Sequence, residues 1–325
     1  MNDRKKILVT GGSGFIGTNV VRHFCENFDV LNLDANAPKN AEDKPLWRKV
    51  DITDLDSVRA AVLQHNPDYI LHLAARTDLE GKTLGDYSAN TDGVKNILAA
   101  AKELPGLKKI IVTSSMLVCR PGYIPAHQCD YSPTTMYGRS KIETEKLTWS
   151  AGIQCDWCLI RPSSIWGEFF GVPYRNFFDM VLARRYFHIG RKGCTKTYGY
   201  IGNAVHEIEK LLFAPTGDSD NKVFYIGDYE PTNIETWADE IACEAYGGKV
   251  RRLPMALVWA LAKAGDLLGM AGVRFPMTSF RLHNMTTNNI VPLSNTEKIV
   301  GPLPYSRIEG VRRTLEWMAK RGGVR

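Results

Sequence analysis

Three polar side chains in the middle of the sequence have the types and spacing of an acid–base site. Tyr137 and Lys141 stand four residues apart at the start of an expected helix, so both project from one face of it. An ammonium group beside a phenol favours the phenolate and lowers the pKa of the phenol toward a working pH. Ser115 ends the expected strand IIVTSS, where its hydroxyl can hydrogen-bond a reacting oxygen at the same crevice. These residues predict proton transfer at a substrate oxygen.

A glycine-rich turn near the amino terminus has the pattern of a dinucleotide site. Gly11, Gly14 and Gly17 are spaced three apart, directly after an expected strand and at the opening of an expected helix. This spacing lets the backbone turn tightly and approach a pyrophosphate, which the positive end of the helix attracts. A turn that serves packing alone would use the same glycines, so the neighbouring residues decide between the two interpretations.

Those neighbours favour NAD. Asp34 ends the second expected strand, where a carboxylate accepts hydrogen bonds from the adenine ribose hydroxyls. No arginine follows closely, which favours NAD over NADP, although Lys39 leaves NADP open. Asp51 can reach adenine, and a surface turn is the alternative for it. The next strand ends in three small or apolar residues that a cofactor could lie against: Leu73, Ala74 and Ala75.

The elements that must position these groups alternate strand and helix through the first half of the chain. Strands are expected at Lys6–Thr10, Asp29–Leu33, Tyr69–Leu73, Ile110–Ser114 and Asp156–Arg161. Helices are expected at Gly14–Phe28, Leu55–His65, Asn90–Leu104 and Met136–Trp149. This alternation predicts an α/β fold, with a doubly wound parallel sheet of the Rossmann type and a ligand crevice at the carboxyl ends of its strands.

The second half of the sequence differs in composition, since it contains aromatic and basic loops and longer helical segments. We expect residues 1–165 to form an NAD-binding domain and residues 166–325 a smaller, mostly helical substrate-binding lobe. A strand near residues 222–226 is expected to rejoin the sheet of the first domain.

Composition narrows the class of protein further. The 325 residues are 44% hydrophobic and 23% charged, which predicts a globular core and excludes general disorder. A net charge of +6 is too small to indicate nucleic-acid binding. Seven scattered cysteines suit reduced thiols, and no signal or membrane-spanning segment is expected, so we expect a cytoplasmic protein. Cys155 and Cys158 lie in an expected strand without two further ligands, so no metal site is expected.

These motifs together resemble the extended short-chain dehydrogenase/reductase family, in the NAD-dependent epimerase/dehydratase branch that includes UDP-galactose 4-epimerase. The resemblance covers essentially the whole chain. It is carried by TGGSGFIG at 10–17, HLAA at 72–75, SSMLV at 114–118, YGRSK at 137–141 and RPSSIWG at 161–167, with Asp34, Asp51, Asn90 and Gly93.

The resemblance implies roles for individual residues. Tyr137 would be the acid/base, Lys141 would orient the nicotinamide ribose and tune the tyrosine, and Ser115 would hold the substrate hydroxyl. NAD would be bound by the residues named above and by Phe15, Ile16, Ile52, Asn90 and Pro162. The resemblance also implies a homodimer through two helices of the first domain, one of which carries Tyr137.

Departures from the family pattern bear on the reaction. Dehydratases of the family place an Asp-Glu pair where this chain has Met116 and Leu117, which cannot transfer protons. Dehydration, and decarboxylation on similar grounds, are therefore disfavoured. Ser164 replaces an asparagine that is often seen, and Gly202-Asn203 replaces a common acidic pair, so the identity of the substrate stays open.

Positive charge gathers in the second half. Residues 1–165 hold 20 basic and 19 acidic side chains, whereas residues 166–325 hold 21 and 16. From 184 to 196 there are five basic residues and no acidic one, which predicts either a solvated face or a diphosphate site; by resemblance, Lys196 matches an arginine on the diphosphate. The candidate substrate-binding residues are Ser115, Ser164, Arg191, Lys196 and Arg281.

Several aromatic and apolar segments have two interpretations. Phe169, Phe170, Tyr174 and Phe177 could stack on a base, but core packing is the preferred interpretation. The stretch Met255–Met270 is apolar enough for a buried helix, which is our default expectation. The alternative is peripheral membrane contact, in which this helix and the basic surface meet a lipid-diphosphate sugar.

The expected function is NAD-dependent oxidation and re-reduction of a ring hydroxyl in an activated sugar, carried by a nucleotide or another diphosphate, most simply as a sugar 4-epimerase. One alternative is one-way reduction of a 4-keto sugar or of a ketone like those of 3β-hydroxysteroid dehydrogenase relatives. A second alternative is a protein that binds NAD without catalysis, although such a protein would not need Tyr137, Lys141 and Ser115.

Overall fold

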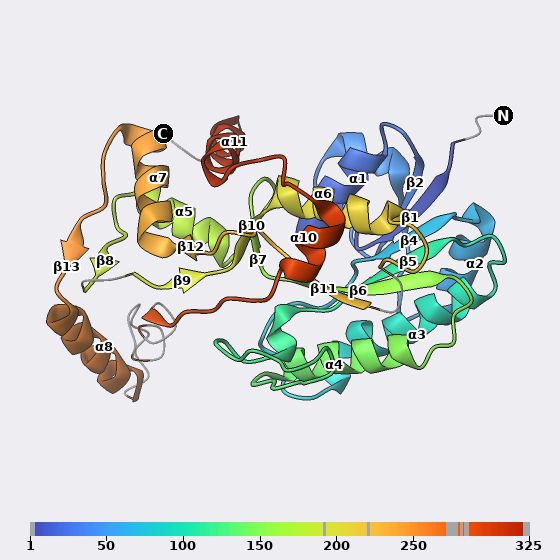
Figure 1. Ribbon diagram of the computed structural model, residues 1–325, viewed down its shortest axis with the longest axis horizontal. Helices are drawn as coiled ribbons and strands as arrows, with labels where there is room; N and C mark the ends of the chain where they lie inside the picture. Colours follow the sequence, from blue (N-terminus) through green and yellow to red (C-terminus); the bar gives the residue numbers. More distant parts are fainter. Residues whose placement is uncertain are drawn as a thin grey trace.

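The computed structural model describes residues 4–190, 193–219, 222–270, 279, 282 and 286–320. A seven-stranded parallel sheet forms the core of its first lobe, on the right in Figure 1. The spatial order is β3-β2-β1-β4-β5-β6-β11. The strands are β1 (Lys6–Thr10), β2 (Asp29–Asp34), β3 (Trp47–Lys49), β4 (Tyr69–His72), β5 (Lys109–Thr113), β6 (Asp156–Pro162) and β11 (Lys222–Ile226). The chain builds outward from β1 to β3 and then returns to the other side of β1, so the order reverses between β1 and β4. Such a reversal opens a crevice at the carboxyl ends of the strands, and the expected Rossmann-type fold is confirmed.

Helices cover both faces of this sheet because each strand buries side chains on both sides. In β1, Ile7 and Val9 belong to one apolar cluster and Leu8 belongs to the other. The first face is covered by α1 (Phe15–Phe24), α6 (Ile201–Phe213) and α10 (Ser294–Val300), and the second by α2 (Leu55–His65), α3 (Ser88–Lys102) and α4 (Met136–Trp149). Three short 3₁₀ turns lie at Ala41–Leu46, Gly85–Tyr87 and Met116–Val118.

The rest of the chain forms a second lobe beside the sheet. Its helices are α5 (Tyr174–Leu182), α7 (Ile234–Tyr246), α8 (Met255–Met270) and α11 (Arg307–Lys320). Three pairs of short strands connect them: β7 (Ser164–Trp166) with β10 (Tyr198–Tyr200), β9 (Thr195–Lys196) with β12 (Thr232–Asn233), and β8 (His188–Ile189) with β13 (Arg252–Leu253). The expected mostly helical lobe therefore also contains small strand pairs, whose lengths are too short for a sequence pattern to predict.

The two halves of the sequence are interleaved in space. The strand β11 lies beside β6 at the sheet edge, and α6 packs against α1, although both elements follow residue 166. The division into residues 1–165 and 166–325 stays a prediction.

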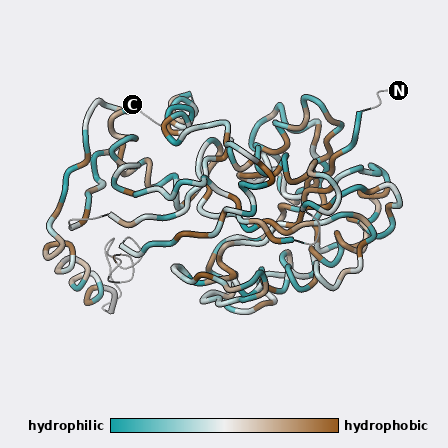
Figure 2. The backbone as a smooth tube through the Cα atoms, in the orientation of Figure 1, coloured by the Kyte–Doolittle hydropathy of each residue, from teal (hydrophilic) through white to brown (hydrophobic). Residues whose placement is uncertain are grey.

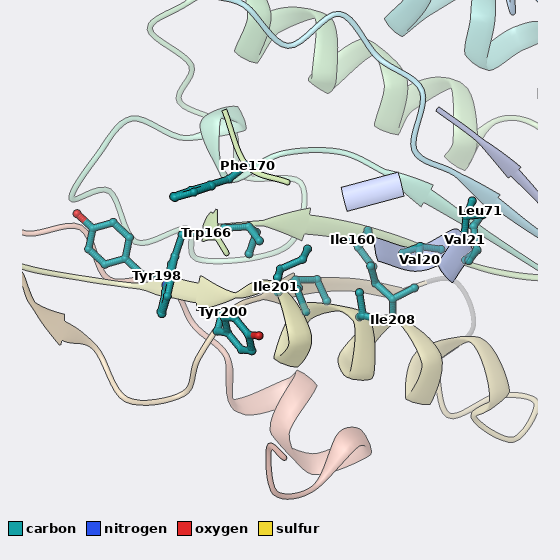
Figure 3. Packing of buried hydrophobic residues seen from close by; sticks show 14 of the residues in the cluster. Val20, Val21, Leu71, Ile160, Trp166, Phe170, Tyr198, Tyr200, Ile201 and Ile208 are labelled. Carbon is teal, nitrogen blue, oxygen red and sulfur yellow. The ribbon is translucent and has the colours of Figure 1, made fainter. Parts of the chain in front are cut away.

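Aromatic rings fill the space between sheet and second lobe (Figure 3). The ring of Trp166 lies 5.0 Å from that of Trp237 and 5.3 Å from that of Tyr200. The aromatic residues considered for base stacking pack in the same region: Phe170 is buried, and the ring of Phe177 lies 4.8 Å from that of Trp237. These contacts agree with core packing as the preferred interpretation.

The apolar helix α8 differs from the expectation of a buried core helix. Val258 and Ala262 are buried, but Trp259 is 57% exposed and Leu267 is 63% exposed. Figure 2 shows hydrophobic segments on this peripheral helix as well as in the central strands. The expectation of burial was wrong for most of the helix because, among the described residues, one stripe of it contacts the lobe and most of its other side chains are exposed.

Trp237→Ala is expected to lower the free energy of unfolding by about 3–5 kcal/mol, because it empties the space between several buried rings. Trp259→Ala is the matched control, since its exposed indole leaves no cavity, and we expect a change within about 0.5 kcal/mol. Urea unfolding followed by circular dichroism measures both values. Equal effects of the two substitutions would contradict the packing described here.

Candidate active site

The glycine turn between β1 and α1 requires residues without a Cβ. Gly11 has a φ of +75°, and a Cβ at this position would lie 2.6 Å from the backbone of Ala74. A Cβ at Gly17 would collide with the carbonyl oxygen of Gly11. The turn therefore brings the loop after β1 against the loop after β4, at the point where the strand order reverses.

This turn fits the pyrophosphate of a dinucleotide. Gly14 caps α1 without a side-chain hydrogen bond, and no acidic residue occupies the first turn of this described helix. The first backbone N–H groups of α1 are thus directed at the crevice with the positive end of the helix dipole. Phe15 and Ile16 are half-buried and pack against the core, so they fix the direction in which α1 leaves the turn.

Asp34 lies beside the same turn at the end of β2. Its Oδ2 accepts a hydrogen bond from the backbone N–H of Ser13 at 3.1 Å, and its Oδ1 accepts one from Asn36 at 2.8 Å. A half-buried carboxylate at this place suits ribose hydroxyls. Asp51 is exposed and accepts from the N–H and hydroxyl of Thr53, as a turn residue does, so its contact with adenine stays a prediction.

The strand-end residues Leu73, Ala74 and Ala75 are half-buried along the crevice. The N–H of Leu73 donates to the carbonyl of Thr10 at 3.1 Å, which continues the β1–β4 ladder past its end. His72 just before them is fully buried, and burial and the neighbouring Lys141 lower the pKa of its imidazole to about 3. Its Nδ1 lies 2.7 Å from the hydroxyl of Thr10, so a neutral histidine joins β4 to β1.

The structure brings Tyr137 and Ser115 together, as the sequence predicts. Both are buried, and their hydroxyls are hydrogen-bonded to one another. The pKa of Tyr137 differs from the expectation, because burial raises it more than the hydrogen bond from Ser115 lowers it, and Tyr87 raises it further. Ser115 also accepts a hydrogen bond from the N–H of Leu117 at 3.1 Å, which fixes its side chain.

Lys141 lies one helical turn after Tyr137 and bonds to the sheet. Its Nζ donates to the carbonyl oxygen of Thr113 at 2.8 Å. Burial lowers the pKa of this ammonium group to about 7, and the nearby Glu145 opposes that change. The ammonium group therefore lies at the end of β5. The hydrogen bond that the structure gives it goes to the Thr113 carbonyl, whereas the sequence predicted that it would lie beside the phenol of Tyr137.

A buried ion pair lies beneath these residues. Arg161 of β6 donates to both carboxylate oxygens of Glu145 of α4, at 2.8 and 2.7 Å. The hydroxyls of Ser114 and Tyr131 donate to the same carboxylate at 2.5 and 2.8 Å. Because Ser114 precedes Ser115 and Glu145 follows Lys141 by one turn, the pair fixes both sides of the candidate site.

Asn90, Ile52 and Pro162 complete the expected cofactor residues. The buried amide of Asn90 donates to Ser140 on α4 at 2.9 Å and exchanges hydrogen bonds with the backbone of Arg76. Ile52 is buried against α3, and Pro162 is half-buried at the end of β6. In this structure Asn90 ties α3 to α4, and its contact with a cofactor stays a prediction.

The expected substrate residues are more dispersed. Ser164 is buried in β7 and shares a hydrogen bond with Tyr174, whereas Lys196 is half-buried on β9. Arg191 and Arg281 lie outside the described residues, so their roles remain predictions.

Sequence reasoning missed one residue that bridges the lobes at the site. Asn289 donates to the sulfur of Met116 at 3.8 Å and accepts a hydrogen bond from the N–H of Gly122 at 3.1 Å. Its backbone pairs with Thr195 and Thr197 beside β9. No local signal marks Asn289, because its partners are far away in the sequence. Thr113 could have been found, since it ends the strand before Ser115.

Comparisons with known proteins agree with this geometry. The family model described as "NAD dependent epimerase/dehydratase family" matches residues 7–204. The chain is 27% identical to a 3-beta-hydroxysteroid dehydrogenase of Mycolicibacterium neoaurum, over 94% of this chain and 89% of that protein. It is 26% identical to the N-acetyl-alpha-D-glucosaminyl-diphospho-ditrans,octacis-undecaprenol 4-epimerase of Escherichia coli O157:H7, over 98% and 96%.

A solved structure shows the same fold. The UDP-glucose 4-epimerase of Thermotoga maritima, crystallised with UDP-glucose, superposes with a TM-score of 0.73 at 21% identity, over 97% of this chain and 99% of that chain.

Lys141→Met is expected to raise the free energy of unfolding above that of the parent protein, and this gain should be largest at and below pH 7. The ammonium has a pKa of about 7 when folded and an ordinary value of 10.5 when unfolded. The unfolded chain therefore binds more protons in this range, and the stability of the parent protein rises with pH between these values. The gain from Lys141→Met should shrink as pH rises from 7 toward 10.5.

Urea unfolding at the two ends of that range measures this change. Lys146→Met, at an exposed lysine of the same helix, is the control. Its effect on the free energy of unfolding should be the same at both pH values. A gain from Lys141→Met that stays constant with pH would show that the buried lysine does not titrate as described.

Proposed function

Because the chain belongs to the NAD dependent epimerase/dehydratase family, we propose that it inverts a ring hydroxyl of a diphosphate-activated sugar, most simply at C4. The observation that carries this proposal is the grouping of Tyr137, Ser115 and Lys141 around the end of β5 and the start of α4, two strands along the sheet from the glycine turn after β1. NAD held by the glycine turn and Asp34 would supply reversible hydride transfer at the ring carbon that bears this hydroxyl, and an epimerisation would not consume it.

The residues of this chain would supply proton transfer and orientation. Ser115 would hydrogen-bond the reacting oxygen and so hold it at the hydroxyl of Tyr137. Tyr137 would take the proton of that oxygen and later give it back. Its raised pKa keeps the phenol protonated at rest, so a nearby positive charge is needed to make it a base. Lys141, held at the strand end by Thr113, would provide that charge.

The two residues that follow Ser115 in the chain favour epimerisation over elimination. Met116 and Leu117 occupy the positions at which the resembling dehydratases carry acidic side chains. Neither residue has a group that can remove a carbon-bound proton or protonate a leaving hydroxyl. The relative from Escherichia coli is named for the same kind of reaction on a diphosphate-linked sugar, which supports both the reaction and the class of carrier.

A second candidate function is oxidation of a bulkier alcohol or reduction of its ketone. The similarity to the 3-beta-hydroxysteroid dehydrogenase, over 94% of this chain, favours this alternative. The same three residues would act on one hydroxyl, but the nicotinamide would be consumed. Absorbance at the nicotinamide band separates the two: net change with each turnover indicates the dehydrogenase, and none indicates the epimerase.

Tyr137→Phe is expected to lower kcat about 10²- to 10⁴-fold, because it removes the hydroxyl that exchanges the proton with the substrate under this proposal. The assay follows conversion of nucleotide sugars to their epimers by NMR, with NAD absorbance recorded in parallel. Tyr246→Phe, at a half-buried tyrosine of α7, is the matched control and should keep its activity. Full activity of Tyr137→Phe on every converted sugar would overturn the proposed role.

Asp34→Ala is expected to reduce the preference for NAD over NADP about tenfold or more. The carboxylate accepts from ribose hydroxyls and repels a 2′-phosphate, and alanine does neither. Fluorescence titration with NADH and NADPH gives both dissociation constants. Asp29→Ala, at the exposed start of the same strand, controls for loss of surface charge. An unchanged ratio of the two constants would contradict the assignment of Asp34.

A further inference from the structure

The helix α8 lies at the end of the molecule opposite to β2 (Figure 1), and several of its large apolar side chains are exposed. Within this helix of 16 residues, those with substantial exposure are Met255, Leu257, Trp259, Leu267 and Leu268. Val258 and Ala262 face the small apolar cluster with Ile189 and Leu282. Among the described residues, α8 is therefore anchored by one stripe, and its exposed apolar side chains lie outside the described core clusters. A large exposed apolar patch of this kind indicates an interaction site.

Basic residues lie on the segments that lead into this helix and on the strand pair before it. Lys249, Arg251 and Arg252 are exposed on the approach to α8, and the neighbouring turn before β8 exposes Arg184 and Arg185. Between residues 249 and 268 there are four basic residues and one acidic residue. That acidic residue, Asp266, bonds with Ser279, and the Glu235 carboxylate nearby pairs with Arg252. The patch thus carries excess positive charge beside its apolar side chains.

Trp259 and Lys263 give the patch the arrangement of an interfacial helix. The Nζ of Lys263 lies 5.8 Å from the centre of the Trp259 ring, on the exposed part of α8. Indole and lysine side chains favour the boundary between lipid headgroups and acyl chains, where one end is apolar and the other is hydrated. At about 1.5 Å per residue, this helix is shorter than the roughly 20 residues that a membrane span needs. In the part of the chain that the structure describes, no helix is long and apolar enough to cross a membrane.

We propose that α8 and its basic border dock on the surface of an anionic membrane, with α8 lying in the plane of the interface. The apolar side chains would enter the boundary of the acyl chains, and the exposed lysine and arginine side chains would contact the anionic headgroups. This occupant is preferred to a second copy of the chain because a second copy would bring the same positive charges together. The proposal is independent of the proposed reaction, since docking needs neither substrate nor turnover.

Vesicle flotation of the full chain tests the proposal. Wild-type protein is mixed with vesicles of phosphatidylglycerol and phosphatidylcholine in equal parts, or of phosphatidylcholine alone, at about 0.1 M salt. The expected result is binding at least about tenfold stronger to the anionic vesicles, and weaker binding at about 1 M salt, because the headgroup attraction is screened. Absence of binding to the anionic vesicles overturns the proposal, and this comparison requires no variant.

Variants locate the docking surface. Trp259→Glu with Leu267→Glu should weaken binding to anionic vesicles about tenfold or more, because carboxylates are placed where apolar groups enter the interface. Leu55→Glu, at a leucine 44% exposed on α2 of the other lobe, is the matched control and should bind as wild type does. Circular dichroism and the thermal midpoint establish that each variant is folded.

Two further results would count against the membrane. Unchanged vesicle binding by the folded double variant would place the contact elsewhere on the molecule. Light scattering that shows self-association lost in the double variant, together with no vesicle binding by wild type, would identify a second copy as the partner of α8.

Discussion

The buried ion pair between Glu145 and Arg161 is the interaction on which the geometry of the candidate site depends. Arg161 comes from the sheet and Glu145 from the helix that carries Tyr137 and Lys141. Both charges are removed from water, so the pair is tolerated only because hydroxyl groups of Ser114 and Tyr131 satisfy the carboxylate as well. Any shift of α4 along the sheet would break several of these bonds at once. The pair thus fixes the position of α4 relative to β5 and β6.

A second constraint comes from the close approach of two loops at the reversal of strand order. Gly11 touches the backbone beside Ala74, so the turn after β1 and the end of β4 share one edge of the crevice. His72 and Thr10 bond just below this edge and keep the two strands in register. The end of the crevice proposed for the dinucleotide is therefore built from backbone geometry, whereas the end proposed for the reaction is built from side chains that follow β5 and lie on α4. The ion pair and the glycine turn act on opposite ends of one crevice.

The second lobe brings further residues to this crevice. Asn289 meets Met116 from across the crevice, at the place where related dehydratases carry acids, and so brings a late segment of the chain against the site. The lobe itself is held by ring packing around Trp237. Its outer helix α8 contributes no described side chain to that cluster. In this chain, the residues that the second lobe brings to the site are thus held independently of the sheet and its buried pair.

The sequence by itself determined the features that depend on neighbours within about one turn or strand. Three such features are local and could be predicted: the glycine turn, the spacing of Tyr137 and Lys141, and the alternation of strands with helices. The partner of the Lys141 ammonium, the ion pair of Glu145 and the contact of Asn289 were decided only by tertiary structure, because they join residues distant in sequence. The exposure of α8 was equally hidden: a helix that is apolar on nearly every side carries no periodicity to show which stripe the protein buries.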